Sequence, residues 1–168
     1  MRELSRQLKT AGADPARLFE GAGPLVERLR AEQPFISGAA MVARARQILA
    51  ELGEAEQIAV IDAHPRIGEP AEQVRAKSAQ AFQEQGYDGV GGADHTPPEV
   101  FRELARLNQA YERKFGFRFV VFVNRRPKAE LVPVLEDRLS RSRAEELKTA
   151  LAEIVAIAED RLRRPPLD

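Results

Sequence analysis

One of only two histidines in the chain, His64, lies in the sequence Asp62-Ala-His64-Pro65-Arg66-Ile67-Gly68. A residue before a proline is disfavoured in the α region, so we expect a helix to stop here and leave His64 at the start of a loop. An imidazole titrates near physiological pH, which makes a histidine in such a place a candidate general acid or base. The same pattern is also typical of a histidine that merely ends a helix, and the sequence alone leaves both interpretations open.

Arg161 is a second candidate for chemistry, because it borders the apolar face of the last expected helix, three or four residues after Ile157 and Ala158. A cation near the C-terminal end of a helix is common and modestly stabilising, and the spacing alone favours that interpretation. The alternative is a guanidinium that turns inward and pairs with a carboxylate.

The elements that must position these residues are expected to be helices. Apolar residues at helical spacing predict a short helix near residues 25–31, a longer one that Ser37 caps, and another over residues 54–63. Asp14-Pro15 is typical of a helix start, with proline at the first helical position. Residues 71–85 are rich in good helix formers, so we expect one polar helix that lies on the surface or lines a polar cavity.

The C-terminal half continues with three further helices. Thr96 is expected to cap the first of them. The second contains Pro133, either in its first turn or at a kink. Ser142-Arg-Ala-Glu145 is a capping box, so it predicts the start of the last helix, and Pro165-Pro166 predicts its end. The inward face of this last helix is expected to be Leu147, Leu151, Ile154, Ala158 and Leu162.

Two other stretches are expected to lack regular structure. The range from Gly86 to Gly92 is glycine-rich, but no Lys-Ser or Lys-Thr follows it, so it predicts a connector rather than a phosphate-binding loop. The range from Phe115 to Val123 has the aromatic and β-branched composition of a strand. Because the chain offers no second good strand to pair with it, we expect an extended segment buried among helices.

Composition excludes several classes of protein. The length of 168 residues suits a single domain with a sizeable core. Basic and acidic residues both number 26, which disfavours a nucleic-acid partner, since such proteins usually carry a basic excess. The absence of cysteine excludes disulfides, thiolate metal sites and cysteine nucleophiles. No apolar run approaches the roughly 20 residues of a membrane helix, and the N-terminal residues lack the apolar core of a secretory signal, so we expect a cytoplasmic protein without a membrane partner.

Several segments, taken in order, resemble the 2-oxo-4-hydroxy-4-carboxy-5-ureidoimidazoline (OHCU) decarboxylases of urate breakdown. The match runs from about Phe19 to Leu162, and the order and spacing of its motifs are together fairly specific. The motifs that carry it are Arg30-Ala-Glu-Gln-Pro34-Phe35, His64-Pro65-Arg66-Ile67-Gly68, Glu84-Gln85, the run from Leu107 to Val120, Arg138-Leu139, Arg143, Glu146-Leu147, Glu153-Ile154 and Arg161-Leu162.

The resemblance implies an all-α fold, a homodimer and a small-molecule ureidoimidazoline substrate, with neither a metal nor a cofactor. It implies that His64 is the central acid–base residue and that Glu84 acts beside it. It further implies that the main chain of the Phe119–Val123 segment contacts the substrate. The substrate-binding positions implied by the family are Pro65, Ala81, Gln85, Phe119, Val120, Val121, Phe122, Val123 and Arg161.

One position departs from the family pattern. The family usually reads Ser-x-x-Glu-Gln, whereas the serine position is Ala81 here, and Ser78, one helical turn earlier, cannot simply replace it. A missing hydroxyl removes one hydrogen bond to the substrate, which is worth about 0.5–1.5 kcal/mol. We therefore expect weaker catalysis or a shifted specificity, with the site itself retained.

The implied reaction expels carbon dioxide from a small anionic ring and delivers a proton to one face, which yields (S)-allantoin. The bond electrons pass into the neighbouring C=N of the substrate, so the protein has to hold the carboxylate in place and supply an acid–base group. Two alternatives stay open: a non-catalytic or re-specialised relative with the same fold, which Ala81 motivates, and a helical interaction module without chemistry. The second alternative predicts that His64, Glu84, Gln85 and Arg161 lie scattered on the surface.

Overall fold

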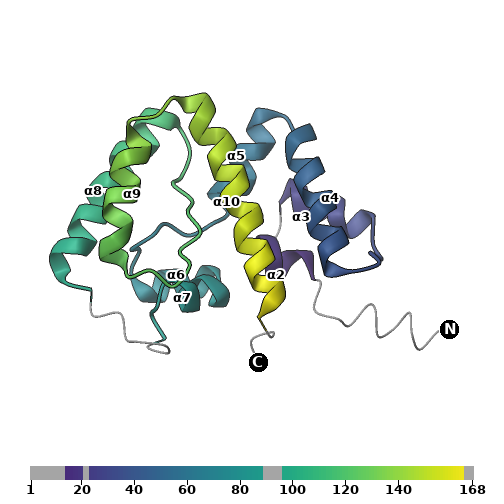
Figure 1. Cartoon of the computed structure of the whole chain (residues 1–168), viewed down its shortest axis with the longest axis horizontal. Helices are drawn as coiled ribbons and strands as arrows, with labels where there is room; N and C mark the ends of the chain where they lie inside the picture. Colours follow the sequence, from purple (N-terminus) through teal and green to yellow (C-terminus); the bar gives the residue numbers. More distant parts are fainter. Residues whose placement is uncertain (1–13, 21–22, 89–95, 165–168) are drawn as a thin grey trace. The chain divides into compact units, whose positions relative to one another are not determined.

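The computed structural model describes residues 14–20, 23–88 and 96–164, and its helices carry the labels of Figure 1. Every regular element in these residues is a helix, and none of them is a strand, so the predicted all-α class is confirmed. The chain forms two compact units, one of residues 1–63 with 151–168 and one of residues 64–150. The single domain expected over residues 1–168 stays a prediction. Within the described ranges, no helix has both the length and the apolar character needed to cross a membrane.

The first unit contains α2 (Pro15–Phe19), α3 (Pro24–Ala31), α4 (Gly38–Glu51), α5 (Glu54–Asp62) and the later part of α10 (Arg143–Arg163). Two of its helix starts were predicted and are confirmed. The Asp14 carboxylate accepts a hydrogen bond from the Ala16 N–H at 3.1 Å, and the Ser37 hydroxyl accepts one from the Ala40 N–H at 3.0 Å. These bonds satisfy donors that the first turn of a helix leaves unpaired. The core of the unit includes the fully buried Leu18, Leu29, Met41, Ala45, Ile48, Ile61, Ile154 and Ala158.

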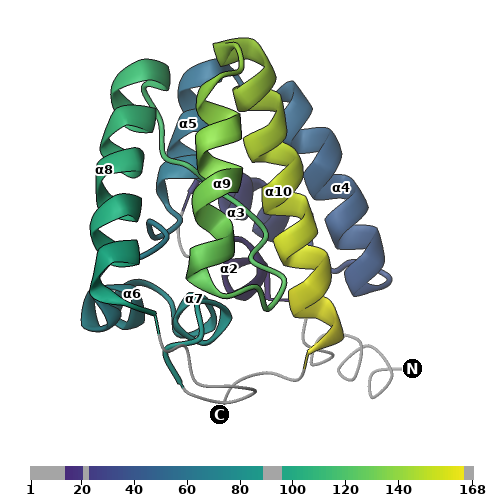
Figure 2. The same cartoon turned by 60° about the vertical axis from the view of Figure 1, so that its left-hand side comes forward.

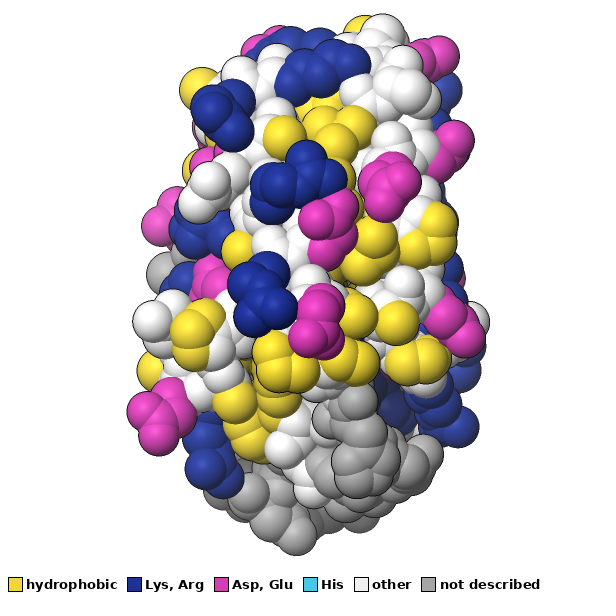
Figure 3. All heavy atoms as spheres, turned by 90° about the vertical axis from the view of Figure 1, so that its left-hand side faces the viewer, with side chains coloured by type: hydrophobic (Ala, Val, Ile, Leu, Met, Phe, Trp, Pro, Cys, Tyr) yellow, Lys and Arg dark blue, Asp and Glu magenta, His cyan; other side chains and the backbone are white. Residues whose placement is uncertain are grey.

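The second unit contains α6 (Ala71–Lys77), α7 (Ala79–Glu84), α8 (Pro98–Phe115), α9 (Lys128–Leu139) and the beginning of α10. Helices α8 and α9 lie side by side in both views (Figure 1 and Figure 2). Tyr111 is at the centre of their core, with its ring centroid 4.6 Å from that of Phe115 and 5.4 Å from that of Phe119. On the face shown in Figure 3, basic and acidic side chains alternate among apolar ones, and neither sign of charge gathers into a patch.

The prediction of one helix over residues 71–85 is wrong, because the helix breaks at Ser78. The backbone of Ser78 is extended, with φ −159° and ψ 117°, and its hydroxyl accepts a hydrogen bond from the Ala81 N–H at 3.0 Å. A serine side chain can bond nearby backbone donors in this way, which offers the chain an alternative to a continuous helix. Ser78 therefore ends α6 and caps α7.

The remaining helix limits agree with the sequence in part. The residue that precedes α8 is Pro97, so this helix starts one residue later than a Thr96 cap implies. Because α9 already starts at Lys128, Pro133 lies inside the helix rather than in its first turn. The capping box of α10 is confirmed, since the Ser142 N–H donates to Glu145 Oε2 at 2.9 Å and the Glu145 N–H donates to Ser142 Oγ at 3.2 Å.

The expected inward face of α10 is only partly correct. Ile154 and Ala158 are fully buried, whereas Leu147, Leu151 and Leu162 are half-buried. The buried positions also include Ala150, Val155, Ile157 and Arg161, so the buried face lies to one side of the expected stripe. Pro165-Pro166 lies outside the described residues.

The segment between α8 and α9 is extended and buried, as predicted. Gly116 ends α8 in the left-handed conformation, with φ 79°, and its N–H donates to the Glu112 carbonyl at 2.8 Å. A glycine adopts this conformation without the steric penalty of a side chain. In the segment that follows, the buried residues are Phe117, Phe119, Val120, Val121 and Val123.

Candidate functional site

His64 is the first residue of the second unit and follows Ala63, the C-cap residue of α5. The predicted position at the start of a loop is confirmed, but the side chain is buried, with only 3% of its surface exposed. Its carbonyl oxygen accepts a hydrogen bond from Arg118 Nη1 at 3.1 Å, which connects the loop to the extended segment after α8. Pro65 is buried beside it.

Two amide side chains, one directly after α7 and one on α8, hold the main chain of the three residues after Pro65. Gln85 Oε1 accepts from the Gly68 N–H at 3.0 Å, and Gln85 Nε2 donates to the Arg66 carbonyl at 3.2 Å. Asn108 Nδ2, on α8, donates to the Ile67 carbonyl at 2.9 Å. The loop that follows His64 is therefore fixed by amide side chains rather than by regular secondary structure.

Gly68 lies where this loop passes close to Leu104 on α8. Its φ of +82° is a conformation that residues with a side chain rarely adopt. A Cβ atom at this position would lie 3.1 Å from Leu104 Cδ1 and 3.3 Å from Leu104 Cβ. The conformation therefore favours glycine, and the close approach leaves little room for a Cβ atom unless the Leu104 side chain shifts.

Ion pairs surround the same loop. Arg66 binds both carboxylate oxygens of Glu112, from Nε and Nη2, at 2.9 Å each. Glu69 accepts from Lys77 Nζ at 2.9 Å and from the Arg66 N–H at 3.2 Å. Burial by itself raises the pKa of the Glu69 carboxyl, but the hydrogen bonds and charges of Lys77 and Arg66 outweigh it and hold that pKa below its usual value.

Glu84 and Gln85 lie at the end of α7. Glu84 is its last residue and is half-buried, and Gln85 is 5% exposed, with its N–H donating to the Ala81 carbonyl at 2.9 Å. The side chain of Ala81 is buried, at the position where the family pattern has a hydroxyl. Since the Gln85 amide binds Arg66 and Gly68, the structure brings the Glu84-Gln85 turn and the His64 loop together directly.

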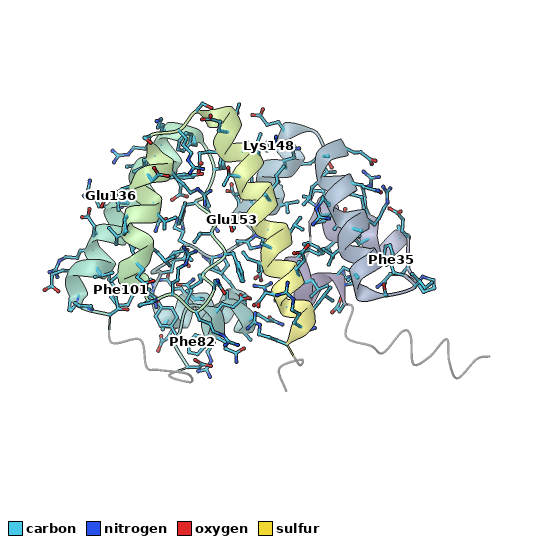
Figure 4. The ribbon with its side chains drawn as sticks, in the orientation of Figure 1. Phe35, Phe82, Phe101, Glu136, Lys148 and Glu153 are labelled. Carbon is cyan, nitrogen blue, oxygen red and sulfur yellow. The ribbon has the colours of Figure 1, made fainter. Side chains whose placement is uncertain are left out.

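Lys128, the first residue of α9, supports this turn and was missed by the sequence analysis. It is 1% exposed, its ammonium donates to the Gln85 carbonyl, and it lies 4.0 Å from the centroid of the Tyr87 ring. Phe82 and Phe101, labelled in Figure 4, pack against the same ring, at 5.6 and 6.5 Å between centroids. A lysine at a helix start gives no sign of burial in a single sequence, so no pattern could have identified it.

The carbonyl groups of the extended segment are bound by arginine side chains. Arg138 Nη1 donates to the Val120 carbonyl at 2.7 Å, and Arg126 donates to the Phe122 and Val123 carbonyls at 2.6 and 3.0 Å. The main chain at Phe119–Val123, expected to contact substrate, is thereby held in place without a partner strand.

Arg138 also belongs to a buried charged network. Glu146 Oε1 accepts from Arg138 Nε at 2.7 Å and from the Tyr111 hydroxyl at 2.6 Å. Burial, together with the neighbouring Glu146, raises the pKa of the Tyr111 phenol well above its usual value, so Tyr111 is a neutral donor.

Arg161 lies in the first unit. Its guanidinium is turned inward, is 1% exposed, and forms an ion pair with the buried carboxylate of Glu20. It also donates to the carbonyl oxygens of Arg17 and Leu18, at 3.1 and 3.3 Å. The inward alternative is therefore the one observed, with a carboxylate of the same chain as partner, and the substrate-binding role that the resemblance implies for Arg161 stays a prediction.

The alternative of a helical interaction module predicted that the four candidate side chains lie scattered on the surface. His64, Gln85 and Arg161 are buried and Glu84 is half-buried, so this prediction is not met.

The predicted glycine-rich connector is described only in part. Gly86 follows Gln85 in the described part of the chain, whereas residues 89–92 of the connector lie outside it. Within the ranges that the structure describes, no three His, Cys, Asp or Glu side chains are grouped in a way that could hold a metal ion.

The sequence matches the model of a known protein family. The model described as OHCU decarboxylase matches residues 9–163. A 2-oxo-4-hydroxy-4-carboxy-5-ureidoimidazoline decarboxylase of Halalkalicoccus jeotgali is 30% identical over 157 residues, which are 89% of this chain and 85% of the relative. A protein of the same name from Haloferax volcanii is 30% identical over 145 residues, 86% of this chain and 82% of the relative.

The uric acid degradation bifunctional protein PucL of Bacillus subtilis is also 30% identical over 145 residues, which cover 86% of this chain but only 28% of that protein. Among solved structures, a crystal structure of OHCU decarboxylase in the presence of (S)-allantoin matches with a TM-score of 0.69, 24% identity and coverage of 90% of this chain and 96% of that chain. At this identity the structural match supports the fold alone.

Proposed function

The chain belongs to the OHCU decarboxylase family, and we propose that it converts 2-oxo-4-hydroxy-4-carboxy-5-ureidoimidazoline to (S)-allantoin in urate breakdown. Its enzyme class is then carbon–carbon lyase. The observation that carries the proposal in the structure is the bonding of Gln85 to Arg66 and Gly68, which joins the two motifs expected to perform the chemistry.

His64 transfers the proton in the proposed mechanism. When carbon dioxide leaves, the electron pair of the broken bond passes into the C=N of the substrate ring, and the carbanion equivalent must be protonated on one face. A buried imidazole, 3% exposed, can make this transfer with little competition from solvent. Glu84, at the end of α7, orients either His64 or the substrate hydroxyl.

The remaining groups of the proposed site bind and orient the substrate. Gln85 uses one hydrogen of its amide nitrogen on Arg66, and the second hydrogen is available for a ring or ureido oxygen. Pro65 and Ala81 contribute buried surface, and the main chain of Phe119–Val123 contributes polar groups. Because the electron sink belongs to the substrate, the proposed reaction requires no added cofactor.

A homodimer is part of the proposal and rests on the family resemblance, whereas the cytoplasmic location stays a prediction. Sedimentation analysis of the purified protein tests the first, since a single species of about 19 kDa would contradict a dimer of this 18.7-kDa chain.

The central experiment compares the parent protein with His64→Asn and His64→Ala on freshly generated substrate. Circular dichroism follows the appearance of chiral (S)-allantoin, and the far-ultraviolet signal of each variant reports its helical fold. We expect the parent to accelerate (S)-allantoin formation and both variants to lose turnover while they keep their helices. Near-normal turnover in His64→Asn would remove His64 from the mechanism, and a parent without activity would favour the non-catalytic relative.

A further inference from the structure

Asn108 is a polar residue on an otherwise apolar face of α8. The buried positions of this helix are Leu104, Leu107, Asn108, Tyr111 and Phe115. Asn108 is 4% exposed, and its Oδ1 has no hydrogen-bond partner among the residues that the structure describes. A buried polar atom without a partner lowers stability, so an apolar side chain of similar size would suit this face better. The presence of the amide therefore needs another explanation.

The nitrogen atom of the same side-chain amide gives that explanation. Asn108 Nδ2 donates to the Ile67 carbonyl at 2.9 Å. The groups on either side of this carbonyl, the Arg66 carbonyl and the Gly68 N–H, are both bound by the Gln85 amide. Asn108 on α8 thus completes a clamp with Gln85, the residue directly after α7, and together the two amides bind three consecutive residues of one loop.

This clamp acts close to the proton-transferring group. Only Pro65 separates His64 from the clamped residues, and the proline ring fixes its own φ. At the other end, the His64 carbonyl is held by Arg118 at 3.1 Å. With both ends of so short a segment held, little freedom of the His64 backbone is left, and release of the Ile67 carbonyl would restore some of it.

We propose that Asn108 is a positioning residue for His64, acting through the main chain of Ile67; this inference rests on the function proposed above. Asn108 touches the loop rather than the substrate, so it affects the rate of the chemical step more than the binding of substrate. A displacement of about 1 Å at a reacting group can lower a rate on the order of 100-fold.

Asn108→Leu and Asn108→Ala test the proposal, with Gln109→Ala as a matched control. Leu keeps the branched shape and the number of non-hydrogen side-chain atoms of Asn108 and removes its donor, whereas Ala also removes the branch. Gln109 is an exposed amide on the next residue of α8. At a temperature where circular dichroism shows every variant folded, we expect kcat to fall roughly 10- to 100-fold in both Asn108 variants, with KM within about threefold of the parent and Gln109→Ala unchanged.

A double variant shows whether the effect passes through His64. If it does, Asn108→Leu causes no further loss in residual turnover when His64 is already Ala, because groups that act as a unit give non-additive losses. A full additional loss in the double variant would overturn the proposal. So would a kcat within twofold of the parent in Asn108→Leu, or loss of the helical signal in both Asn108 variants, which would assign the amide to folding.

The outcomes also separate this inference from the proposed function. If the parent turns over the substrate, His64→Ala does not, and Asn108→Leu behaves as the parent, only the role of Asn108 is wrong. If the parent forms no (S)-allantoin above the uncatalysed rate, the proposed function fails and the role of Asn108 fails with it.

Discussion

Arg138 donates a hydrogen bond from Nη1 to the carbonyl oxygen of Val120 at 2.7 Å. The same guanidinium binds Glu146 at 2.7 Å from Nε and lies 4.5 Å from the centroid of the Phe119 ring. One side chain thus connects α9, α10 and the extended segment that is proposed to contact substrate.

The first prediction concerns stability. Arg138→Leu leaves the carboxylate of Glu146, which is fully buried, with only the longer ion pair to Arg141 at 3.9 Å. We expect the free energy of unfolding, measured by urea titration, to fall by about 3–5 kcal/mol, which is the usual effect of removing one partner of a buried ion pair.

The double variant Arg138→Leu with Glu146→Leu should recover a large part of this loss, because no uncompensated charge remains. Arg102→Ala is the control, since its pair with Glu99 is exposed on both sides and exposed pairs contribute little. Equal losses in the Arg138 and Arg102 variants would contradict the assignment of the buried pair.

The second prediction concerns Gly68. Gly68→Ala forces a side chain into φ +82° and against Leu104, so we expect a loss of roughly 1–3 kcal/mol in stability and a lower kcat, since the His64 loop must shift. Gly53→Ala is a matched control, because Gly53 has φ −65° and no atom lies within 4 Å of the position that a Cβ would take there. Thermal denaturation and steady-state rates of the two variants should therefore diverge, and similar values would refute the close approach.

The third prediction is a pH dependence from Glu69. Its pKa in the folded protein lies below the usual value of about 4.3, so its ionised form stabilises the fold above that pH. This contribution is lost as the pH falls from about 4.3 through the lowered folded pKa. Urea titrations between pH 7 and pH 3 should show a smaller loss of stability in Glu69→Gln than in the parent. Parallel curves for the two proteins would show that Glu69 contributes nothing to acid unfolding.

The fourth prediction concerns the departure at Ala81. If the hydroxyl of the family pattern binds substrate, Ala81→Ser should raise kcat/KM by the equivalent of about 0.5–1.5 kcal/mol, or roughly two- to twelvefold. Ala81 is buried and follows the Ser78 cap by one helical turn, so Ser78→Ala is a useful comparison that weakens α7 without adding a hydroxyl. An unchanged kcat/KM in Ala81→Ser would show that the parent site does not depend on that hydroxyl.

Features that depend on neighbours in the sequence could be predicted. The caps at Asp14, Ser37 and Ser142 each involve a partner within three residues, and each is observed. The end of a helix before His64-Pro65 follows from the steric restriction on a residue before proline. The extended segment could be predicted because a single strand candidate had nothing to pair with.

Features that depend on partners distant in the sequence could not be predicted. Asn108 binds a carbonyl 41 residues away, and Arg161 pairs with a carboxylate 141 residues away. No spacing rule connects such residues, so the clamp on the His64 loop and the partner of Arg161 became visible only in three dimensions. The break at Ser78 was missed for a different reason: serine is compatible both with a helix interior and with a cap, and local propensity does not separate the two.

The burial of Lys128 allows chemical labelling to probe the corner where the start of α9 contacts the turn after α7. An ammonium that is 1% exposed and covered by the Tyr87 ring reacts with an amine-specific reagent only when this corner opens, whereas Lys148, on an exposed position of α10, reacts at once. The ratio of the two acylation rates then measures the free energy of local opening. The Lys128 ammonium holds the carbonyl of Gln85. The same ratio, followed by mass spectrometry during turnover, therefore measures local opening at the proposed site.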